Sequence, residues 1–240
     1  MTEWWTYRLS DFLLFSPRTY YRLIERYNAA VWPAHVLMLA VGAGILWMLL
    51  RPTPGRSRAT AALLAALWTW VAWAFVWRRY ATINWAATYF GCLFAIEAVL
   101  LGWIGVVRRG LQFRAVQGTG AVAGVVLLAF AVVVYPLLAP AAGRDWRQAE
   151  AFGIAPDPTV IGTLGILLLA ESRARTALFV VPGLLVAISG ATLWAMAAPE
   201  KWVMPCVLLY AAVALRRDSS SRGVPGTGDA RAAARRETNL

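Results

Sequence analysis

The chain has 240 residues, of which 60% are hydrophobic and 15% are charged, and its formal net charge is +11. Soluble domains usually carry about 25% charged residues, so this composition excludes an ordinary soluble enzyme or binding domain. All of the basic residues except Lys201 are arginines, and they lie in short loops and the tail beside apolar segments. That placement is typical of contacts with anionic lipid headgroups and does not indicate nucleic acid binding.

Residues 1–30 are expected to form an amphipathic segment and not a membrane span. Ser16 and Pro17 predict the start of a helix, with serine as the N-cap and proline at the first helical position. Apolar residues then recur on one helical face, with arginines elsewhere on the circumference: Tyr20, Leu23, Ile24, Tyr27 and Val31 against Arg18, Arg22 and Arg26. Such a helix either lies in the membrane interface or packs as a cap on a helical bundle.

Residues 31–215 are expected to form an all-α, polytopic transmembrane helical bundle. Five apolar blocks approach the roughly 20 residues that cross a bilayer: 31–50, 60–77, 84–107, 119–139 and 176–197. Two shorter blocks follow at 158–170 and 202–215. These blocks contain almost every apolar residue, so no segment remains for a separate soluble domain.

The topology has two alternatives: six crossings plus one short re-entrant helix, or seven crossings. Block 158–170 is short, because thirteen helical residues reach about 20 Å and the hydrocarbon core is about 30 Å thick. The six-crossing arrangement also places more arginines inside, so the positive-inside rule favours it. In both arrangements residues 216–240 form a basic cytoplasmic tail, whose composition predicts disorder.

The first apolar block follows four arginines and is too long for a signal-peptide core, so we expect no cleavable signal peptide. The loops are expected at 51–58 and at 140–157, where Trp146 and Phe152 suggest contact with the membrane surface. Cys92 and Cys206 lie inside apolar blocks and are interpreted as small buried hydrophobic residues, with neither a disulfide nor a metal site.

Small residues at helical spacing predict close helix packing. Three such stripes occur: Ala87, Gly91, Ala95, Ala98 and Gly102; Gly120 and Gly124; and Gly183, Ala187, Ala191 and Ala195. The spacing leaves open whether the partner helices belong to the same chain or to another copy.

Ionisable side chains inside a span are costly, so each is a functional candidate. Glu97 is the strongest, because it lies near the middle of the third block; we expect it to face the bundle interior and the third helix to be central. His35 and Asn84 are further candidates near one membrane face, and the simpler interpretation of His35 is an interfacial residue bonded to a loop carbonyl. Asp157 and Pro158 are typical of a helix N-cap followed by a first-turn proline. A half-helix there could hold an anion, although a plain helix cap is favoured.

Several segments resemble the bacterial membrane proteins grouped as domain-of-unknown-function family 6064. The opening of that family is similar to residues 10–21 (SDFLLFSPRTYY), to Tyr27-Asn28 and to Val31-Trp32-Pro33. Its second signature is similar to residues 155–159 (APDPT) and 163–165 (TLG). The resemblance implies a multi-pass protein of a bacterial inner membrane. It transfers no activity, and the permease-like labels of some relatives are weak support.

Two functions are therefore considered. One is a small permease or channel, which Glu97 and the short blocks support. The alternative is a non-catalytic structural or accessory subunit of a membrane complex, which the packing stripes support. An enzyme is not expected, because no convergent set of polar groups is recognisable, and no cofactor or metal site is predicted. The expected partners are the lipid bilayer and either a second copy of the chain or another membrane subunit.

Overall fold

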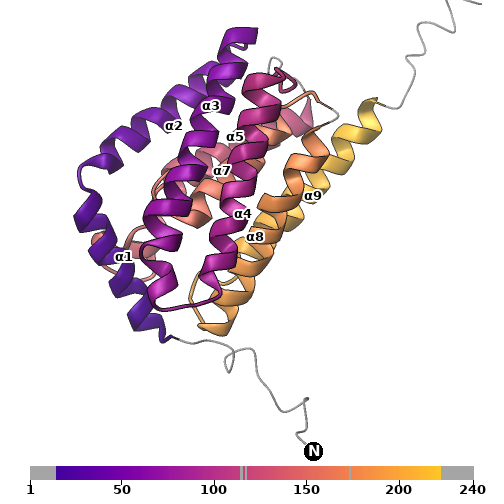
Figure 1. Cartoon of the computed structure of the whole chain (residues 1–240). Helices are drawn as coiled ribbons and strands as arrows, with labels where there is room; N and C mark the ends of the chain where they lie inside the picture. Colours follow the sequence, from indigo (N-terminus) through magenta and orange to yellow (C-terminus); the bar gives the residue numbers. More distant parts are fainter. Residues whose placement is uncertain (1–14, 114–115, 117, 173, 223–240) are drawn as a thin grey trace, which may run out of the picture.

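The computed structural model describes residues 15–113, 116, 118–172 and 174–222, and this part of the chain is almost entirely helical (Figure 1). The main helices are α1 (Pro17–Val31), α2 (Ala34–Leu50), α3 (Pro54–Trp70), α4 (Ala87–Leu100), α5 (Thr119–Ala129), α6 (Leu138–Ala141), α7 (Pro156–Leu168), α8 (Arg175–Ala195) and α9 (Val203–Arg222). Wider π-helical turns continue α3 through Val71–Trp77, α4 through Leu101–Val107 and α5 through Phe130–Val134. Short 3-10 turns occupy Tyr80–Thr82, Tyr135–Leu137 and Trp146–Gln148.

Helix α1 begins as the sequence predicts and lies across one end of the bundle. The Ser16 hydroxyl accepts a hydrogen bond from the backbone N–H of Thr19, and Pro17 opens the helix. The axis then turns by 88° between α1 and α2. The apolar face of α1 buries Tyr20, Ile24 and Tyr27 against the bundle, so this face is covered by protein.

Helix α7, and not the third apolar segment, is the centre of the bundle. All twelve residues from Asp157 to Leu168 are buried. By contrast, α4 packs between α3 and α8 but leaves Ile96 and Val99 exposed. The expectation that the third helix is central is therefore wrong. A short helix can occupy the centre because protein surrounds it, and its ends need not reach the water.

The path of α7 runs from one end of the bundle to the other. It begins beside Tyr135, which donates a hydrogen bond to Asp157. Just after its last turn, Ala170 pairs with Phe113 and the N–H of Glu171 donates to the carbonyl of Gln112. Since residues 112 and 113 precede α5 and Tyr135 follows it, α7 is antiparallel to α5 and does not turn back on itself.

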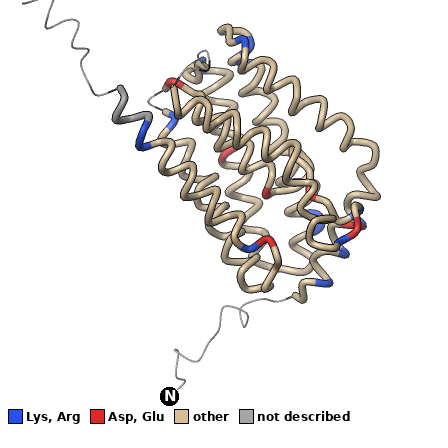
Figure 2. Tube along the Cα trace, turned by 180° about the vertical axis from the view of Figure 1, so that it is seen from behind, with Lys and Arg blue, Asp and Glu red and all other residues tan. Residues whose placement is uncertain are grey.

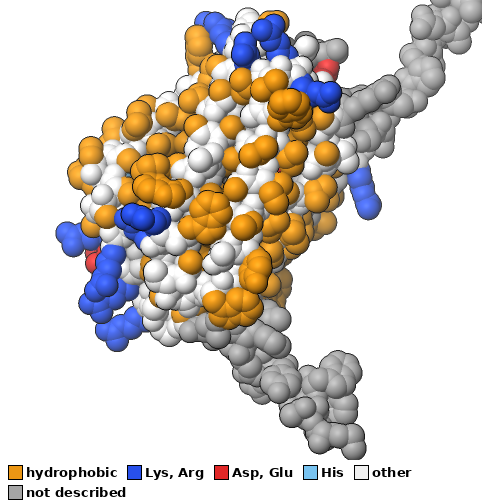
Figure 3. Space-filling view, in the orientation of Figure 1, with side chains coloured by type: hydrophobic (Ala, Val, Ile, Leu, Met, Phe, Trp, Pro, Cys, Tyr) orange, Lys and Arg blue, Asp and Glu red, His pale blue; other side chains and the backbone are white. Residues whose placement is uncertain are grey.

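Four helical segments are long and apolar enough to cross a membrane, or five if the bent pair α1 and α2 counts as one. They are 54–82, 87–107, 119–141 and 175–195. Basic residues collect at the two ends of the bundle (Figure 2). Hydrophobic side chains cover much of the side between those ends (Figure 3). The length and composition of the helices do not confirm either six or seven crossings.

Several local expectations need correction. Helix α3 begins at Pro54 with Thr53 as its N-cap, so the loop predicted at 51–58 is much shorter. Helix α9 continues to Arg222, so residues 216–222 are helical; residues 223–240 of the predicted tail lie outside the described residues. Cys92 and Cys206 are free but exposed on the surface of the bundle, so the expectation that they are buried is wrong.

The loop before α7 is partly folded into the bundle. Trp146 is exposed, as a surface position requires, but Phe152 is 2% exposed. A methyl group on Gly162 would lie 2.5 Å from the Phe152 ring, so the ring fills the space that this glycine leaves on α7. The expectation that Phe152 rests on the membrane surface is therefore wrong, because a closer apolar site exists inside the protein.

Candidate functional site

Asp157 lies in the first turn of α7, but it is not the cap of that helix. The N-cap is Ala155, which makes no side-chain cap bond, and Pro156 opens the helix. Asp157 follows Pro156 and points across to other helices. The interpretation of Asp157 as an N-cap is therefore wrong by two positions. Its charge still lies favourably near the positive end of the helix dipole.

The Asp157 carboxyl is held by two hydroxyl groups from different elements. Ser189 on α8 donates to both carboxyl oxygens, at 2.7 Å to Oδ1 and 2.8 Å to Oδ2. Tyr135, in the 3-10 turn after α5, donates to Oδ2 at 3.0 Å. Hydrogen bonds to an ionised acceptor are about twice as strong as neutral ones. These contacts therefore favour a charged Asp157 at this position.

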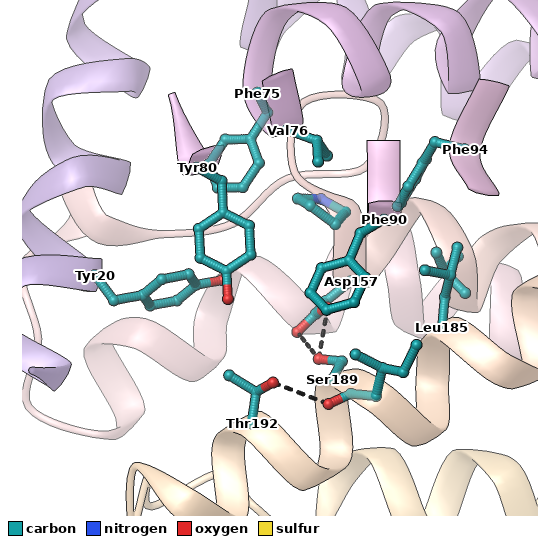
Figure 4. Close-up of a pocket in the computed structure, with 13 residues that line it drawn as sticks. Tyr20, Phe75, Val76, Tyr80, Phe90, Phe94, Asp157, Leu185, Ser189 and Thr192 are labelled. Carbon is teal, nitrogen blue, oxygen red and sulfur yellow. Dashed lines mark hydrogen bonds between the residues drawn. The ribbon is translucent and has the colours of Figure 1, made fainter. Parts of the chain in front are cut away.

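A cavity of about 60 Å³ opens beside Asp157 (Figure 4). Its walls come from α1, the end of the α3 segment, the 3-10 turn at Tyr80–Thr82, α4, α7 and α8, and they are mainly aromatic and aliphatic. The lining residues are Tyr20, Phe75, Val76, Tyr80, Phe90, Phe94, Pro156, Asp157, Val160, Leu185, Ile188, Ser189 and Thr192. Asp157 is the one charged side chain among these lining residues. The site is thus an aromatic chamber with a single carboxyl at its wall.

The aromatic walls are packed against one another. The ring of Tyr80 lies 5.8 Å from that of Tyr20 and 6.1 Å from that of Phe75, measured between centroids. The Tyr80 hydroxyl accepts a hydrogen bond from the Asn84 amide at 3.1 Å. Asn84, predicted as a site residue, therefore lies behind the wall and positions Tyr80 without lining the cavity.

A second polar cluster adjoins the first through Tyr135. A narrow cavity of about 10 Å³ is lined by Tyr135, Arg144, Glu150 and Glu200 together with Leu138 and Ala139. Arg144 forms an ion pair with Glu200, and Tyr21 of α1 donates to the same carboxyl at 3.3 Å. Sequence reasoning did not predict this cluster, because its charged members lie in two loops, where polar residues are ordinarily solvated.

Glu150 is the most unusual member of this cluster. Its side chain is 6% exposed, and its Oε2 atom has no hydrogen-bond partner among the described residues. Burial raises the pKa of this carboxyl well above its usual range, and the negative charge of Asp157 raises it further. Arg144 acts in the opposite direction. Glu150 therefore keeps its proton to a higher pH than an ordinary glutamate does.

Glu97 faces the bundle interior, as expected, and is fully buried. Neither of its carboxyl oxygens has a hydrogen-bond partner within the part of the chain that the structure describes. It lies three residues beyond Phe94, the last α4 residue of the cavity wall, which is about 4.5 Å deeper along the helix. The structure does not bring Glu97 into the cavity.

His35 belongs to a separate contact at the same end. Its Nε2 atom lies 3.1 Å from Oδ1 of Asn28. The Asn28 amide in turn donates to the carbonyls of Arg147 and Ala149, each at 2.8 Å. His35 thus helps to fix α1 to the loop before α7 and does not touch the cavity. Of the four predicted site residues, only Asp157 lines the cavity, while Asn84 supports its wall.

The described residues contain no group of three or more His, Cys, Asp or Glu side chains that could hold a metal ion. What the geometry offers is a buried carboxylate facing aromatic rings. A carboxylate attracts a cation, and the faces of aromatic rings do the same because their π-electrons carry negative potential. The chamber is thus suited chemically to a small cation or a proton.

Comparison with known proteins gives a match to a family model described as "Family of unknown function (DUF6064)", over residues 18–224. No curated protein matches the chain, and no solved structure matches it. The family match covers all of the residues that line the cavity.

Proposed function

Because the chain belongs to DUF6064, a family of unknown function, we propose its role from the site itself: a small membrane permease for a small cation. The observation that carries this proposal is the position of Asp157. It is the charged side chain of an aromatic-walled cavity built by six elements. A carboxyl with only a structural role would not need an open chamber beside it.

The long apolar helices support a multi-pass protein of the bacterial inner membrane. We propose seven crossings, with α7 as a short buried crossing inside the bundle. Two features support this number: α7 runs from the Tyr135 end to the Phe113 end, and α1 lies at the opposite end from the last turn of α9 (Figure 1). The end that contains Arg108 and Arg216 then faces the cytoplasm, and the Asp157 cavity opens toward the other side.

The size and chemistry of the cavity favour a small monovalent cation. A volume of about 60 Å³ exceeds the 10–15 Å³ that one water needs by the same kind of measure, so an ion such as ammonium or methylammonium fits. Asp157 supplies the counter-charge, while the rings of Tyr20, Tyr80 and Phe90 supply cation–π attraction. Glu97, beyond Phe94, provides a second carboxyl deeper in the bundle for the same cation or for a proton.

Uptake of radiolabelled methylammonium into proteoliposomes tests this function. Asp157→Asn keeps the size and shape of the side chain but removes its charge and replaces one accepting oxygen with an N–H donor, so it should abolish uptake. Asp145→Asn is the matched control, because Asp145 is exposed and lies outside the cavity. Equal uptake by Asp157→Asn and the wild type would contradict a cation site at Asp157.

A second candidate function, an accessory subunit of a membrane complex, has one specific observation in its favour. The stripe of Gly183, Ala187, Ala191 and Ala195 lies on α8, where Ala187 and Ala191 are exposed, and no atom lies within 4 Å of a methyl group placed on Gly183. The other two stripes are used within the chain: Gly91 packs on Trp77, and Gly124 packs on α7. The α8 stripe is thus available to another transmembrane helix.

Substitution of a large residue into this stripe separates the two functions. Ala191→Leu should dissociate a complex that uses the α8 stripe, observed as a smaller particle by light scattering in detergent. If the protein acts alone as a permease, the same variant should leave both methylammonium uptake and particle mass unchanged.

A further inference from the structure

Helix α1 carries a stripe of arginines on the side away from the cavity. Arg18, Arg22 and Arg26 are spaced by four residues and are all exposed, so they follow one another along the helix. Tyr20, which lines the Asp157 cavity, points about 200° away from Arg18 at 100° per residue. One helix thus presents an apolar face to the cavity and a basic face to the outside.

The arginines of α1 meet two more at the end of the α3 segment. Arg18, Arg22, Arg26, Arg78 and Arg79 line a groove of about 600 Å³, in the region where Figure 3 shows basic side chains gathered over α1. No acidic side chain is among the residues that line it. Glu25, the nearest acid in sequence, is not among the residues that line the groove, and its carboxyl accepts a hydrogen bond from the Gln148 amide.

None of these five arginines forms an ion pair with a carboxylate within the described residues. Guanidinium groups present several N–H donors in a planar fork that matches phosphate oxygens. Five of them, none paired with a carboxylate of the described residues, form a strongly electropositive surface. The groove is therefore suited to an anion, and a phosphate ester is one whose oxygens guanidinium groups bind in pairs.

An apolar groove continues directly from the basic one. It has a volume of about 460 Å³ and lies in the corner between the end of α1 and the α3 segment, lined by Ala30, Val31, Trp70, Trp73 and Ala74. Arg78 and Arg79 line both grooves. A ligand that fills both would have a phosphate at one end and a hydrocarbon chain at the other.

Three contacts hold the arginines at this junction in place. Arg79 lies over the Tyr27 ring, 4.6 Å from its centroid, and donates to the carbonyl of Ala74 at 2.6 Å. Arg78 lies 5.3 Å from the centroid of the Trp73 ring. Stacking on a ring leaves the N–H groups at the guanidinium edge available to phosphate oxygens.

We propose that these joined grooves bind one anionic phospholipid, with its phosphodiester on the arginines and an acyl chain along Val31 and Trp73. The apolar groove is what favours a lipid over a free phosphate, because a free anion would have no use for it. This site is separate from the Asp157 cavity, and its occupancy does not depend on the proposed transport function.

Lipid retention by the purified protein in native mass spectrometry tests the proposal. The wild type should retain dioleoyl phosphatidylglycerol more tightly than the zwitterionic dioleoyl phosphatidylcholine. Each basic residue near an anionic headgroup contributes about fivefold in affinity, so the triple variant Arg22→Gln, Arg26→Gln and Arg78→Gln should lose roughly 100-fold. The matched control removes the same charge at the opposite end of the bundle, by Arg51→Gln, Arg108→Gln and Arg109→Gln, and should retain the lipid.

The apolar groove is tested by a matched pair of tryptophan substitutions. Trp73→Ala should weaken phosphatidylglycerol binding, whereas Trp103→Ala should not, because both tryptophans are about equally exposed, at 50% and 54%, and only Trp73 lines the groove.

Three outcomes would overturn the proposal. An equal loss of phosphatidylglycerol affinity in the triple variant and in its control would mean that basic residues anywhere on the protein attract the lipid. Equally tight binding of glycerol 3-phosphate alone would mean a free-anion site. Equal retention of both lipids by the wild type would mean that the groove does not select an anionic headgroup. Each outcome is independent of methylammonium uptake, so failure here leaves the Asp157 proposal standing.

Discussion

The backbones of Gly124 on α5 and Gly165 on α7 lie in direct contact. A methyl group on Gly124 would lie 2.5 Å from the carbonyl oxygen of Gly165, and one on Gly165 would lie 2.6 Å from the carbonyl oxygen of Gly124. Only glycine at both positions allows the two helices to approach this closely. The contact fixes α7 against α5 and thereby sets the position of Asp157 at the start of α7.

Gly124→Ala should lower stability, because neither backbone can move away without disturbing the central helix. Overpacking of this kind typically costs about 1–3 kcal/mol, observed as a lower apparent melting temperature in detergent. Gly183→Ala is the matched control on α8, where no atom lies within 4 Å of the added methyl group. It should be neutral or should stabilise by up to about 1 kcal/mol, because alanine has the higher helix propensity. Equal effects of the two substitutions would contradict the close contact.

Glu97→Leu should be neutral or stabilising in detergent. The carboxyl has no hydrogen-bond partner among the described residues, so its removal leaves no other buried group unsatisfied and relieves a desolvation cost of about 1–3 kcal/mol. Glu200→Leu provides the contrast, because it would leave Arg144 without its ion-pair partner; loss of one partner of a buried pair costs about 3–5 kcal/mol.

Methylammonium uptake provides a second test of the role of Glu97. If this carboxyl takes part in transport, Glu97→Gln should abolish methylammonium uptake while the melting temperature stays near that of the wild type. A destabilised Glu97→Leu variant would show that the carboxyl has a stabilising partner after all.

Stability should fall as the pH rises, and Glu150 should contribute to that slope. Burial raises the pKa of Glu150, the charge of Asp157 raises it further, and Arg144 only partly opposes them. The folded state therefore keeps a proton that the unfolded chain releases above a pKa of about 4.3. The contribution is fully favourable below that pH and is lost as the pH rises toward the folded-state value.

Melting curves of Glu150→Gln between about pH 5 and about pH 8 test this sign, because a neutral amide cannot titrate. The variant should show a flatter pH dependence than the wild type. An unchanged slope in Glu150→Gln would assign the pH dependence to other groups.

Seven crossings predict that the loop containing Gly143 is periplasmic and that the end of α9 is cytoplasmic. An alkaline phosphatase inserted at Gly143, an exposed position, should therefore be active, and one fused after Arg222 should be inactive. Six crossings with a re-entrant α7 would place both positions in the cytoplasm. Activity at Arg222 would contradict both arrangements.

Structural features that depend on neighbouring residues could be predicted from the sequence alone. The apolar blocks predicted the helices because helix length and hydrophobicity depend on neighbouring residues. Ser16 and Pro17 predicted the start of α1 for the same reason, and the cost of an ionised group in an apolar segment predicted the inward direction of Glu97. Local reasoning failed at Asp157, where the N-cap was assigned two residues too late.

The tertiary structure alone decided which segments meet. Tyr135 and Ser189 lie 22 and 32 residues from Asp157, and no periodic pattern relates them. Arg144, Glu150 and Glu200 converge from two loops, where sequence reasoning expects contact with water. The central position of α7 is decided in the same way. A short apolar block is ambiguous by length, and only its enclosure by the surrounding helices makes it the buried axis on which the cavity is built.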